Sequence, residues 1–106
     1  AGAAEHLLIA QVTNLVQAMK RLRQADVWLA GLDLSQQAQQ LGQIDLDMAL
    51  AIVVGHEGAC LRRLVRQNCD FLLKLPMRGR VASLNAATAG AIVLYAAWQA
   101  RGYEGV

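Results

Sequence analysis

One uninterrupted apolar run, Met48 to Val54, limits most strongly what this chain can fold into. The run has no polar face, and it leads directly into a glycine-flanked turn at Gly55–Gly58. A short continuous apolar run is typical of a strand that is covered on both faces, as strands are in parallel sheets. We therefore expect an α/β fold in which helices pack on both sides of a sheet.

Other apolar runs predict further strands of the same sheet. These runs are Leu7–Val12, Val27–Leu32 and Phe71–Leu75, and Pro76 stops the last of them. Segments with helical periodicity lie between the runs, and strands that alternate with helices indicate a mainly parallel sheet. The polar, glutamine-rich stretch Ser35–Gln43 predicts a short helix or a loop on the surface.

Apolar residues at helical spacing predict which face of each helix is turned inward. The first helix follows Thr13-Asn14, which offers an N-cap, and its expected inward residues are Leu15, Met19 and Leu22. The second helix has arginines on its outer flank, and its expected inward residues are Leu61, Leu64 and Val65. The expected inward stripe of the last helix is Leu84, Ala87, Ala91, Leu94 and Trp98.

The composition excludes a disordered tail and supplies more apolar residues than a small core buries. Hydrophobic residues make up 56% of the 106 residues, whereas disorder requires low hydrophobicity and high charge. A domain of this size buries only roughly two-thirds of its surface, so we expect part of the apolar area to meet a partner subunit. The net charge of +2 permits an anionic partner without demonstrating one.

We expect a cytoplasmic protein without a membrane span. The opening residues lack the basic region of a signal peptide. The uncharged segment Val81–Ala100 is long enough to cross a bilayer, but its polar residues and alanines favour a buried helix. Cys60 and Cys69 would point to opposite faces of one predicted helix, so free thiols in a reducing compartment are expected.

Loops that follow predicted strands are the candidate ligand-binding segments, namely Gly31–Asp33, Gly55–Gly58 and Leu75–Asn85. In open α/β sheets, ligands bind beyond the carboxyl ends of the strands, and glycines let a ligand approach the backbone. Glu57 stands at the start of a helix, where it is either a capping carboxylate or a catalytic one. Ser83 and Asn85 can cap the last helix or bond a ligand with the same groups.

Other kinds of site lack residues that they need. His56 and Cys60 have the spacing of two helical ligands, but a zinc site needs two more. No G-x-G-x-x-G, Walker or G-x-S-x-G motif occurs, which counts against dinucleotide, NTPase and hydrolase functions. The arginines at 62, 63 and 66 form either an ordinary solvated face or one that steers a phosphate backbone.

Two segments carry a resemblance to a known family. The first runs from Ile52 through Gly-His-Glu-Gly at 55–58 to Asn-Cys-Asp at 68–70, and the second combines Leu-Pro-Met-Arg-Gly at 75–79 with Ser-Leu-Asn at 83–85. They resemble the second and third motifs of the SpoU (TrmH) RNA 2′-O-ribose methyltransferases. Residues 1–15 are similar to the segment between the first and second motifs, so the resemblance covers nearly the whole chain.

The resemblance implies a SPOUT-type α/β fold with a C-terminal trefoil knot, S-adenosylmethionine as cofactor, an RNA substrate (rRNA or tRNA) and a homodimer. By position in the motifs, the principal cofactor contacts would be Gly55, Leu75 and Leu84, and the pocket would be lined by Leu32, Met77 and Ser83. Glu57 and Asn85 match polar catalytic positions of the family. The RNA would lie across Arg78 and Arg80.

The chain also departs from the family pattern. Ala59-Cys60 replaces the usual Lys-Gly, Ala96 and Trp98 replace a Glu and an Arg, and the first motif with its Asn and Arg is absent. In the family, that arginine assists in activating the ribose hydroxyl, and help in removing the proton of this hydroxyl speeds the methyl transfer. Residues 1–106 are therefore interpreted as the C-terminal part of an rRNA guanosine 2′-O-methyltransferase domain that holds the donor. The alternative is a non-catalytic dimerisation or cofactor-binding module that acts with a partner.

Overall fold

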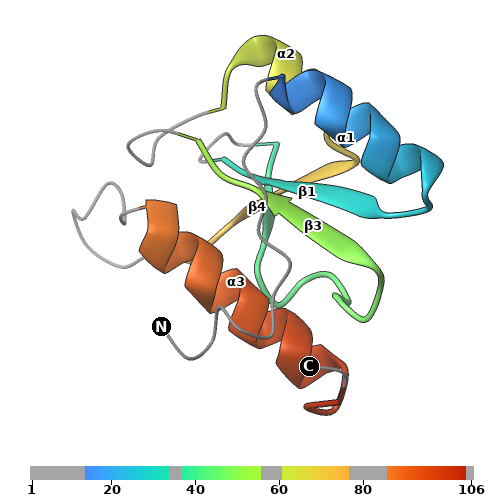
Figure 1. The fold of residues 1–106 in the computed structure, drawn as a ribbon. Helices are drawn as coiled ribbons and strands as arrows, with labels where there is room; N and C mark the ends of the chain where they lie inside the picture. Colours follow the sequence, from blue (N-terminus) through green and yellow to red (C-terminus); the bar gives the residue numbers. More distant parts are fainter. Residues whose placement is uncertain (1–13, 34–36, 56–60, 77–85, 105–106) are drawn as a thin grey trace.

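The computed structural model describes residues 14–33, 37–55, 61–76 and 86–104 of the chain. In this part a sheet of four parallel strands lies between two layers of helices (Figure 1). The strands are β1 (Trp28–Leu32), β2 (Gln39–Gln40), β3 (Leu50–Val53) and β4 (Phe71–Lys74). The helices α1 (Leu15–Gln24) and α2 (Arg63–Gln67) cover one face of the sheet, and α3 (Ala86–Ala100) covers the other.

β4 comes last among the strands along the chain, yet it lies inside the sheet. The order across the sheet is β2-β4-β1-β3, so β4 separates β1 from β2. Ala30 of β1 pairs with Ile52 of β3 on one side and with Phe71 of β4 on the other. Within the described residues, β2 pairs with β4 alone. The expected parallel sheet with helices on both faces is confirmed.

The central strand β1 faces two separate hydrophobic cores, because successive side chains of a strand point to opposite faces. Leu29 is fully buried in the first core, under α1 and α2, together with Met19, Val53, Leu61 and Val65. Ala30 is fully buried in the second core, under α3, together with Leu46, Leu73 and Val93. The sheet therefore has no solvated face over β1, as the apolar runs predicted.

The first helix begins where the sequence predicts it. Asn14 is its N-cap, and its side-chain oxygen accepts a hydrogen bond of 3.0 Å from the backbone N–H of Gln17. Of the three residues expected to face inward, Met19 is buried, whereas Leu15 and Leu22 are about 40% exposed. The prediction was wrong for these two leucines, because the face of α1 that meets the sheet is centred on Met19 and Val16.

The second helix is shorter than predicted and buries fewer residues. α2 has only five residues, and Leu61 and Val65 are buried while Leu64 is 59% exposed. The inward placement of Leu64 was wrong, since a single helical turn can bury only one side. Cys69 is a free thiol and is only partly buried. Because α2 ends at Gln67, Cys69 lies outside that helix, and the long helix expected to carry both cysteines is not found there. Cys60 lies outside the described residues.

The third helix turns a different face to the sheet from the one predicted. Its buried residue is Val93, and Ala96 and Ala97 pack beside it in the second core. The expected inward residues Ala91, Leu94 and Trp98 are exposed instead. Small residues bring the helix close to β3, since a Cβ added at Gly90 would lie 3.5 Å from Cγ1 of Val54. The prediction was wrong because it placed the largest side chains inward.

The polar stretch Ser35–Gln43 was expected to be a surface helix or loop, and its described residues 37–43 form exposed turns that contain a two-residue edge strand. The backbone N–H of Leu41 donates to the carbonyl oxygen of Lys74 at 2.8 Å and extends the pairing of β2 with β4. Both glutamines of β2 are exposed, as suits a short edge strand. The predicted strand Leu7–Val12 lies outside the described residues. None of the described helices is long and apolar enough to cross a bilayer.

Candidate cofactor-binding site

The carboxyl ends of β1, β3 and β4 lie level with one another, at an edge of the sheet that we call the carboxyl edge. The register pairs Gly31 with Val53 and Leu32 with Leu73, so β1 ends between the ends of its two neighbours. Gly55 follows β3, and Leu75 follows β4. Leu32, Gly55 and Leu75 are all partly buried. The carboxyl ends of three strands therefore lie together at the place where open α/β sheets bind ligands.

Gly31 lets the segment that leads into α2 lie directly on β1. A Cβ atom at this position would come 2.6 Å from Cδ1 of Leu61 and 2.7 Å from Sγ of Cys69. Such distances are far inside normal packing contacts, so a side chain at position 31 would push both residues away. The glycine thus has a packing role next to the carboxyl edge, beyond the turn-forming role that its sequence context suggests.

A buried carboxylate stands directly after Leu32 at the carboxyl edge. The side chain of Asp33 has no exposed surface, and its Oδ2 lies 3.7 Å from Nη1 of Arg66 on α2. The backbone N–H of Asp33 donates to the carbonyl oxygen of Leu73 at 3.0 Å. Asp33 therefore connects the turn after β1 to α2 and to β4 at the same point.

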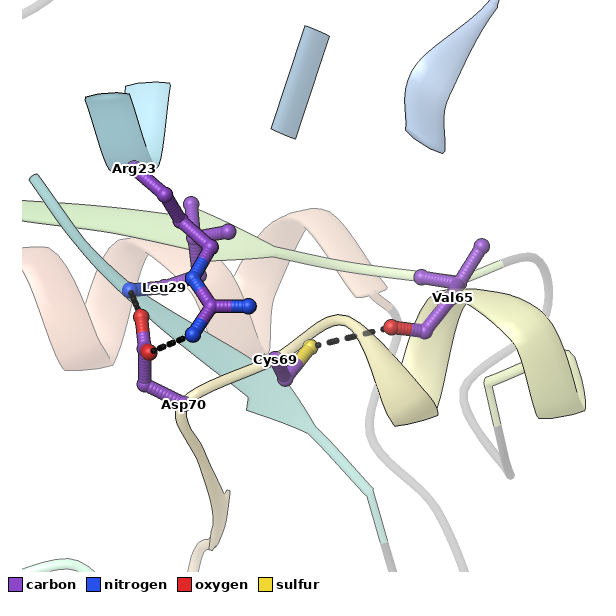
Figure 2. A network of polar contacts seen from close by, with 5 residues as sticks. All are labelled: Arg23, Leu29, Val65, Cys69 and Asp70. Atoms are coloured by element: carbon purple, nitrogen blue, oxygen red, sulfur yellow. Dashed lines mark hydrogen bonds and ion pairs between the residues drawn. The ribbon is translucent and has the colours of Figure 1, made fainter. Parts of the chain in front are cut away.

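A second carboxylate fastens the opposite, amino-terminal end of the sheet (Figure 2). Oδ2 of Asp70 accepts a hydrogen bond of 2.7 Å from the backbone N–H of Leu29, and the N–H of Asp70 donates to the carbonyl of Leu29 at 2.8 Å. Nη2 of Arg23 on α1 lies 3.1 Å from Oδ1 of Asp70. Asp70 therefore fixes where β4 begins against β1.

The thiol of Cys69 is suited to packing and not to chemistry. It donates a hydrogen bond to the carbonyl of Val65 (Figure 2). Burial, followed by the charges of Asp70 and Asp33, raises the pKa of this thiol from 9.0 to about 11. The reactive form of cysteine is the thiolate, which is scarce at neutral pH with such a pKa. Among the described residues, no group of three or more His, Cys, Asp or Glu could hold a metal ion.

The structure brings together those predicted site residues that it describes. Leu32, Gly55 and Leu75 come from three separate parts of the chain, and all lie at the carboxyl edge. The other predicted site residues lie outside the described residues: Glu57, Met77, Arg78, Arg80, Ser83, Leu84 and Asn85.

The pairing of Asp33 with Arg66 was not predicted from the sequence. Asp33 was interpreted as the end of a strand within a candidate ligand-binding loop, and Arg66 as part of an outer face that is either solvated or steers a phosphate backbone. A lone acid after an apolar strand is a weak signal, since most such residues are solvated. Its partner also lies far along the chain, so no local pattern relates the two residues.

Comparison with known proteins decides the family. Residues 1–95 match the sequence profile of the SpoU rRNA Methylase family. The chain belongs to this family. The 23S rRNA (guanosine-2′-O-)-methyltransferase RlmB of Bordetella pertussis is 44% identical over 94 residues, which are 89% of the chain and 38% of that relative. The TrmH-family protein YacO of Bacillus subtilis is 41% identical over 100 residues, 94% of the chain and 40% of its own length.

Solved structures of SpoU proteins share the fold. The A. aeolicus TrmH/SpoU tRNA modifying enzyme superposes with a TM-score of 0.84 at 26% identity, over 98% of this chain and 53% of that one. The SpoU methyltransferase AviRb from Streptomyces viridochromogenes, solved in complex with AdoMet, gives a TM-score of 0.68 at 27% identity, over 88% of this chain and 38% of AviRb. The SPOUT-type α/β fold expected from the motifs is therefore confirmed.

Proposed function

We propose that this chain is the cofactor-binding, C-terminal part of an S-adenosylmethionine-dependent RNA ribose 2′-O-methyltransferase, with a guanosine of rRNA as the preferred target. Its family and the rRNA guanosine methyltransferase among its relatives support this proposal. The observation that carries it is that the carboxyl ends of β1, β3 and β4 lie together at the carboxyl edge. The chain spans about 40% of the length of the curated relatives that it matches.

The chemistry of the carboxyl edge fits an adenosyl group. Leu32 and Leu75 offer apolar side chains, and both pack on the second core, which keeps them in place. Backbone N–H and C=O groups of the turns are suited to the polar rim of an adenine ring, since small-molecule sites combine apolar walls with a few placed polar groups. S-adenosylmethionine, when bound, supplies a methyl group on a sulfonium. The task of the chain is to hold that donor in line with a ribose hydroxyl.

The proposed roles of individual residues follow the family motifs. Gly55, Leu75 and Leu84 make the principal cofactor contacts, and Leu32, Met77 and Ser83 line the pocket. Glu57 and Asn85 are the polar residues at the reacting hydroxyl. Arg78 and Arg80 contact the RNA beside the cofactor. We further propose that the segment after β4 forms the trefoil knot of SPOUT proteins and that the protein acts in the cytoplasm.

A homodimer through the outer face of α3 is part of the proposal. Large apolar side chains are exposed on α3 and just beyond its end: Ile92, Leu94, Tyr95, Trp98 and Tyr103. Exposed apolar patches of this kind mark interaction sites. Three of these residues form an aromatic cluster, in which the rings of Trp98 and Tyr103 are 4.9 Å apart. A second copy of the chain would cover this face.

The end of α3 holds the aromatic cluster in a fixed shape. Gly102 has a positive φ of 68°, its N–H donates to the carbonyl of Gln99, and the N–H of Tyr103 donates to that of Trp98. This pattern is the Schellman motif, which commonly brings the residue after the glycine against the last turn of the helix. The cluster is therefore a rigid surface, as a subunit interface requires.

Calorimetry with S-adenosylmethionine, with NAD as control ligand, tests the cofactor part of the proposal. We expect binding of S-adenosylmethionine and none of NAD. Transfer of a tritiated methyl group to rRNA and to tRNA then tests the activity, and slow transfer to rRNA alone is expected from the part of the domain that this chain comprises. Donor binding without transfer would contradict the activity and favour the module that depends on a partner. Failure to bind the donor would contradict the proposed function as a whole.

A further inference from the structure

Four exposed basic side chains lie on the helical layer that covers the first core. Lys20 and Arg21 stand on the outer side of α1, and Arg62 and Arg63 stand at the start of α2. The two helices pack on the same face of the sheet (Figure 1). We call these four residues the helical basic surface. Neither the cofactor site nor the residues proposed for RNA contact beside it include them.

The carboxylates of this layer do not neutralise the helical basic surface. Asp70 is paired with Arg23, and Asp33 is paired with Arg66, so these two acids are directed at other arginines. Asp26, at the end of α1, is the remaining acid among the described residues of the layer. Among the described residues, no carboxylate lies within ion-pair distance of Lys20, Arg21, Arg62 or Arg63. Four positive charges therefore face solvent on one helical layer.

The position of these charges relates them to the carboxyl edge. α2 follows the segment that leaves β3 at Gly55, so Arg62 and Arg63 stand on the side of the sheet where the candidate site lies. α1 leads into the start of β1, at the other end of the sheet, so Lys20 and Arg21 in the second half of α1 stand farther from that edge. The four basic side chains thus extend from the carboxyl edge across the layer formed by α1 and α2.

We propose that the helical basic surface binds the phosphate backbone of the RNA strand that leads away from the nucleotide at the carboxyl edge. This inference rests on the proposed function, and it adds a contact area outside the cofactor site. Lysine and arginine side chains that neutralise phosphates supply most of the sequence-independent affinity for nucleic acids. Contacts of this kind position the strand without reading its bases.

The surface suits a phosphate chain better than an anionic membrane. The outer side of α1 also carries Gln17 and Gln24, which are exposed and polar. Helices that lie in a membrane interface need a broad apolar face with aromatic anchors, whereas neither α1 nor α2 contains an aromatic residue. α2 is moreover too short, with five residues, to lie in an interface by itself.

Salt dependence of RNA binding tests the proposal. The probe is a fluorescein-labelled, 20-nucleotide single-stranded oligouridylate, and its dissociation constant is measured by anisotropy from 50 to 200 mM KCl. Each phosphate contact contributes about 0.7 to the slope of log Kd against log salt for single strands. The double variants Arg62→Gln/Arg63→Gln and Lys20→Gln/Arg21→Gln should each lower this slope by about 1.4.

Arg101→Gln is the matched control, because Arg101 is an exposed arginine beyond α3, on the opposite side of the sheet. It should leave the slope unchanged, and all variants should bind S-adenosylmethionine as the unaltered chain does. An unchanged slope in both double variants would overturn the proposal, as would binding of phosphatidylserine vesicles in place of RNA. Reduced slopes without any binding of the methyl donor would support the basic surface while contradicting the proposed cofactor.

Discussion

Replacing Gly31 by alanine is the sharpest test of how the first core is packed next to the carboxyl edge. The added Cβ would meet Cδ1 of Leu61 at 2.6 Å, Sγ of Cys69 at 2.7 Å and Cδ2 of Leu72 at 3.1 Å. Leu61 is only 5% exposed, so it has little room to withdraw. The side chains of Leu61 and Cys69 must therefore shift within the packed core for the alanine to fit.

The expected cost follows from this geometry. Inserting a methyl group into a well-packed core typically costs about 1–3 kcal/mol of unfolding free energy. Two of the three contacts lie well inside van der Waals distance, so we expect a value in the upper half of that range. A domain of this size loses about 4–8 °C in Tm for each kcal/mol. Because Leu32 follows directly, weaker binding of S-adenosylmethionine should accompany the loss of stability.

Gly90→Ala is the matched control for this measurement. A Cβ at position 90 would lie 3.5 Å from Cγ1 of Val54, which is an ordinary contact. Alanine is favoured over glycine within a helix by about 0.5–1 kcal/mol, so this variant should be slightly more stable than the unaltered chain. Urea unfolding at one fixed protein concentration measures both variants, and the two midpoints should move in opposite directions.

A double variant identifies the cause of the Gly31→Ala effect. Cys69→Ala removes one of the two closest contacts, so Gly31→Ala should cost less in the Cys69→Ala background than in the unaltered chain. A Gly31→Ala variant that unfolds at the same urea concentration as the unaltered chain would refute the packing argument. An equal loss of unfolding free energy in both backgrounds would refute the steric contribution assigned to Sγ of Cys69.

Substitutions at Asp70, Arg66 and Cys69 test the polar contacts. Asp70→Ala leaves the N–H of Leu29 without its 2.7 Å acceptor and should lower the unfolding free energy by about 1–3 kcal/mol. Asp70→Asn keeps an acceptor and loses only the ion pair with the half-exposed Arg23. It should therefore lower the free energy of thermal unfolding by about 1 kcal/mol or less. Arg66→Met removes the cation that faces the buried Asp33 and should lower the unfolding free energy in urea by about 1–3 kcal/mol. Arg63→Met, at an exposed position, should change the unfolding free energy by no more than about 0.5 kcal/mol. Equal effects of the two substitutions would contradict the pairing of Arg66 with Asp33. The pKa of Cys69 is raised from 9.0 to about 11, so the native thiol keeps a proton that the unfolded one releases, and stability should fall as pH rises through this window. Cys69→Ala should lack that part of the pH dependence. Identical stability–pH profiles of the variant and the unaltered chain would exclude a contribution of the Cys69 thiol.

The strands β1, β3 and β4 and the first helix cap could be predicted because their signals are local. Val27–Leu32 is apolar throughout, and the strand it predicts was found at Trp28–Leu32. Asn14 was predicted as a cap from its place before a helical pattern, and its side chain does accept the N–H of Gln17. The proximity of Leu32, Gly55 and Leu75 could be predicted because parallel strands end at the same edge.

The inward face of α3 could not be predicted in the same way. Nearly every residue of α3 is apolar, so periodicity does not distinguish a face that meets the sheet from one that meets another subunit. Val93 and the alanines beside it face the sheet because small residues permit close approach of α3 to β3. The pairing of Asp33 with Arg66 depends on how α2 lies on the sheet, which no local pattern records.

The place of β4 in the sheet has a consequence for the order in which the chain can fold. β2 finds its hydrogen-bond partner in β4, a strand that leaves the ribosome well after it. β1 and β3 can pair as soon as both exist, but the space beside β1 must stay open until Phe71–Lys74 is inserted there. A nascent chain that stalls before this insertion would expose two unpaired edges at once, and it would be prone to association through them.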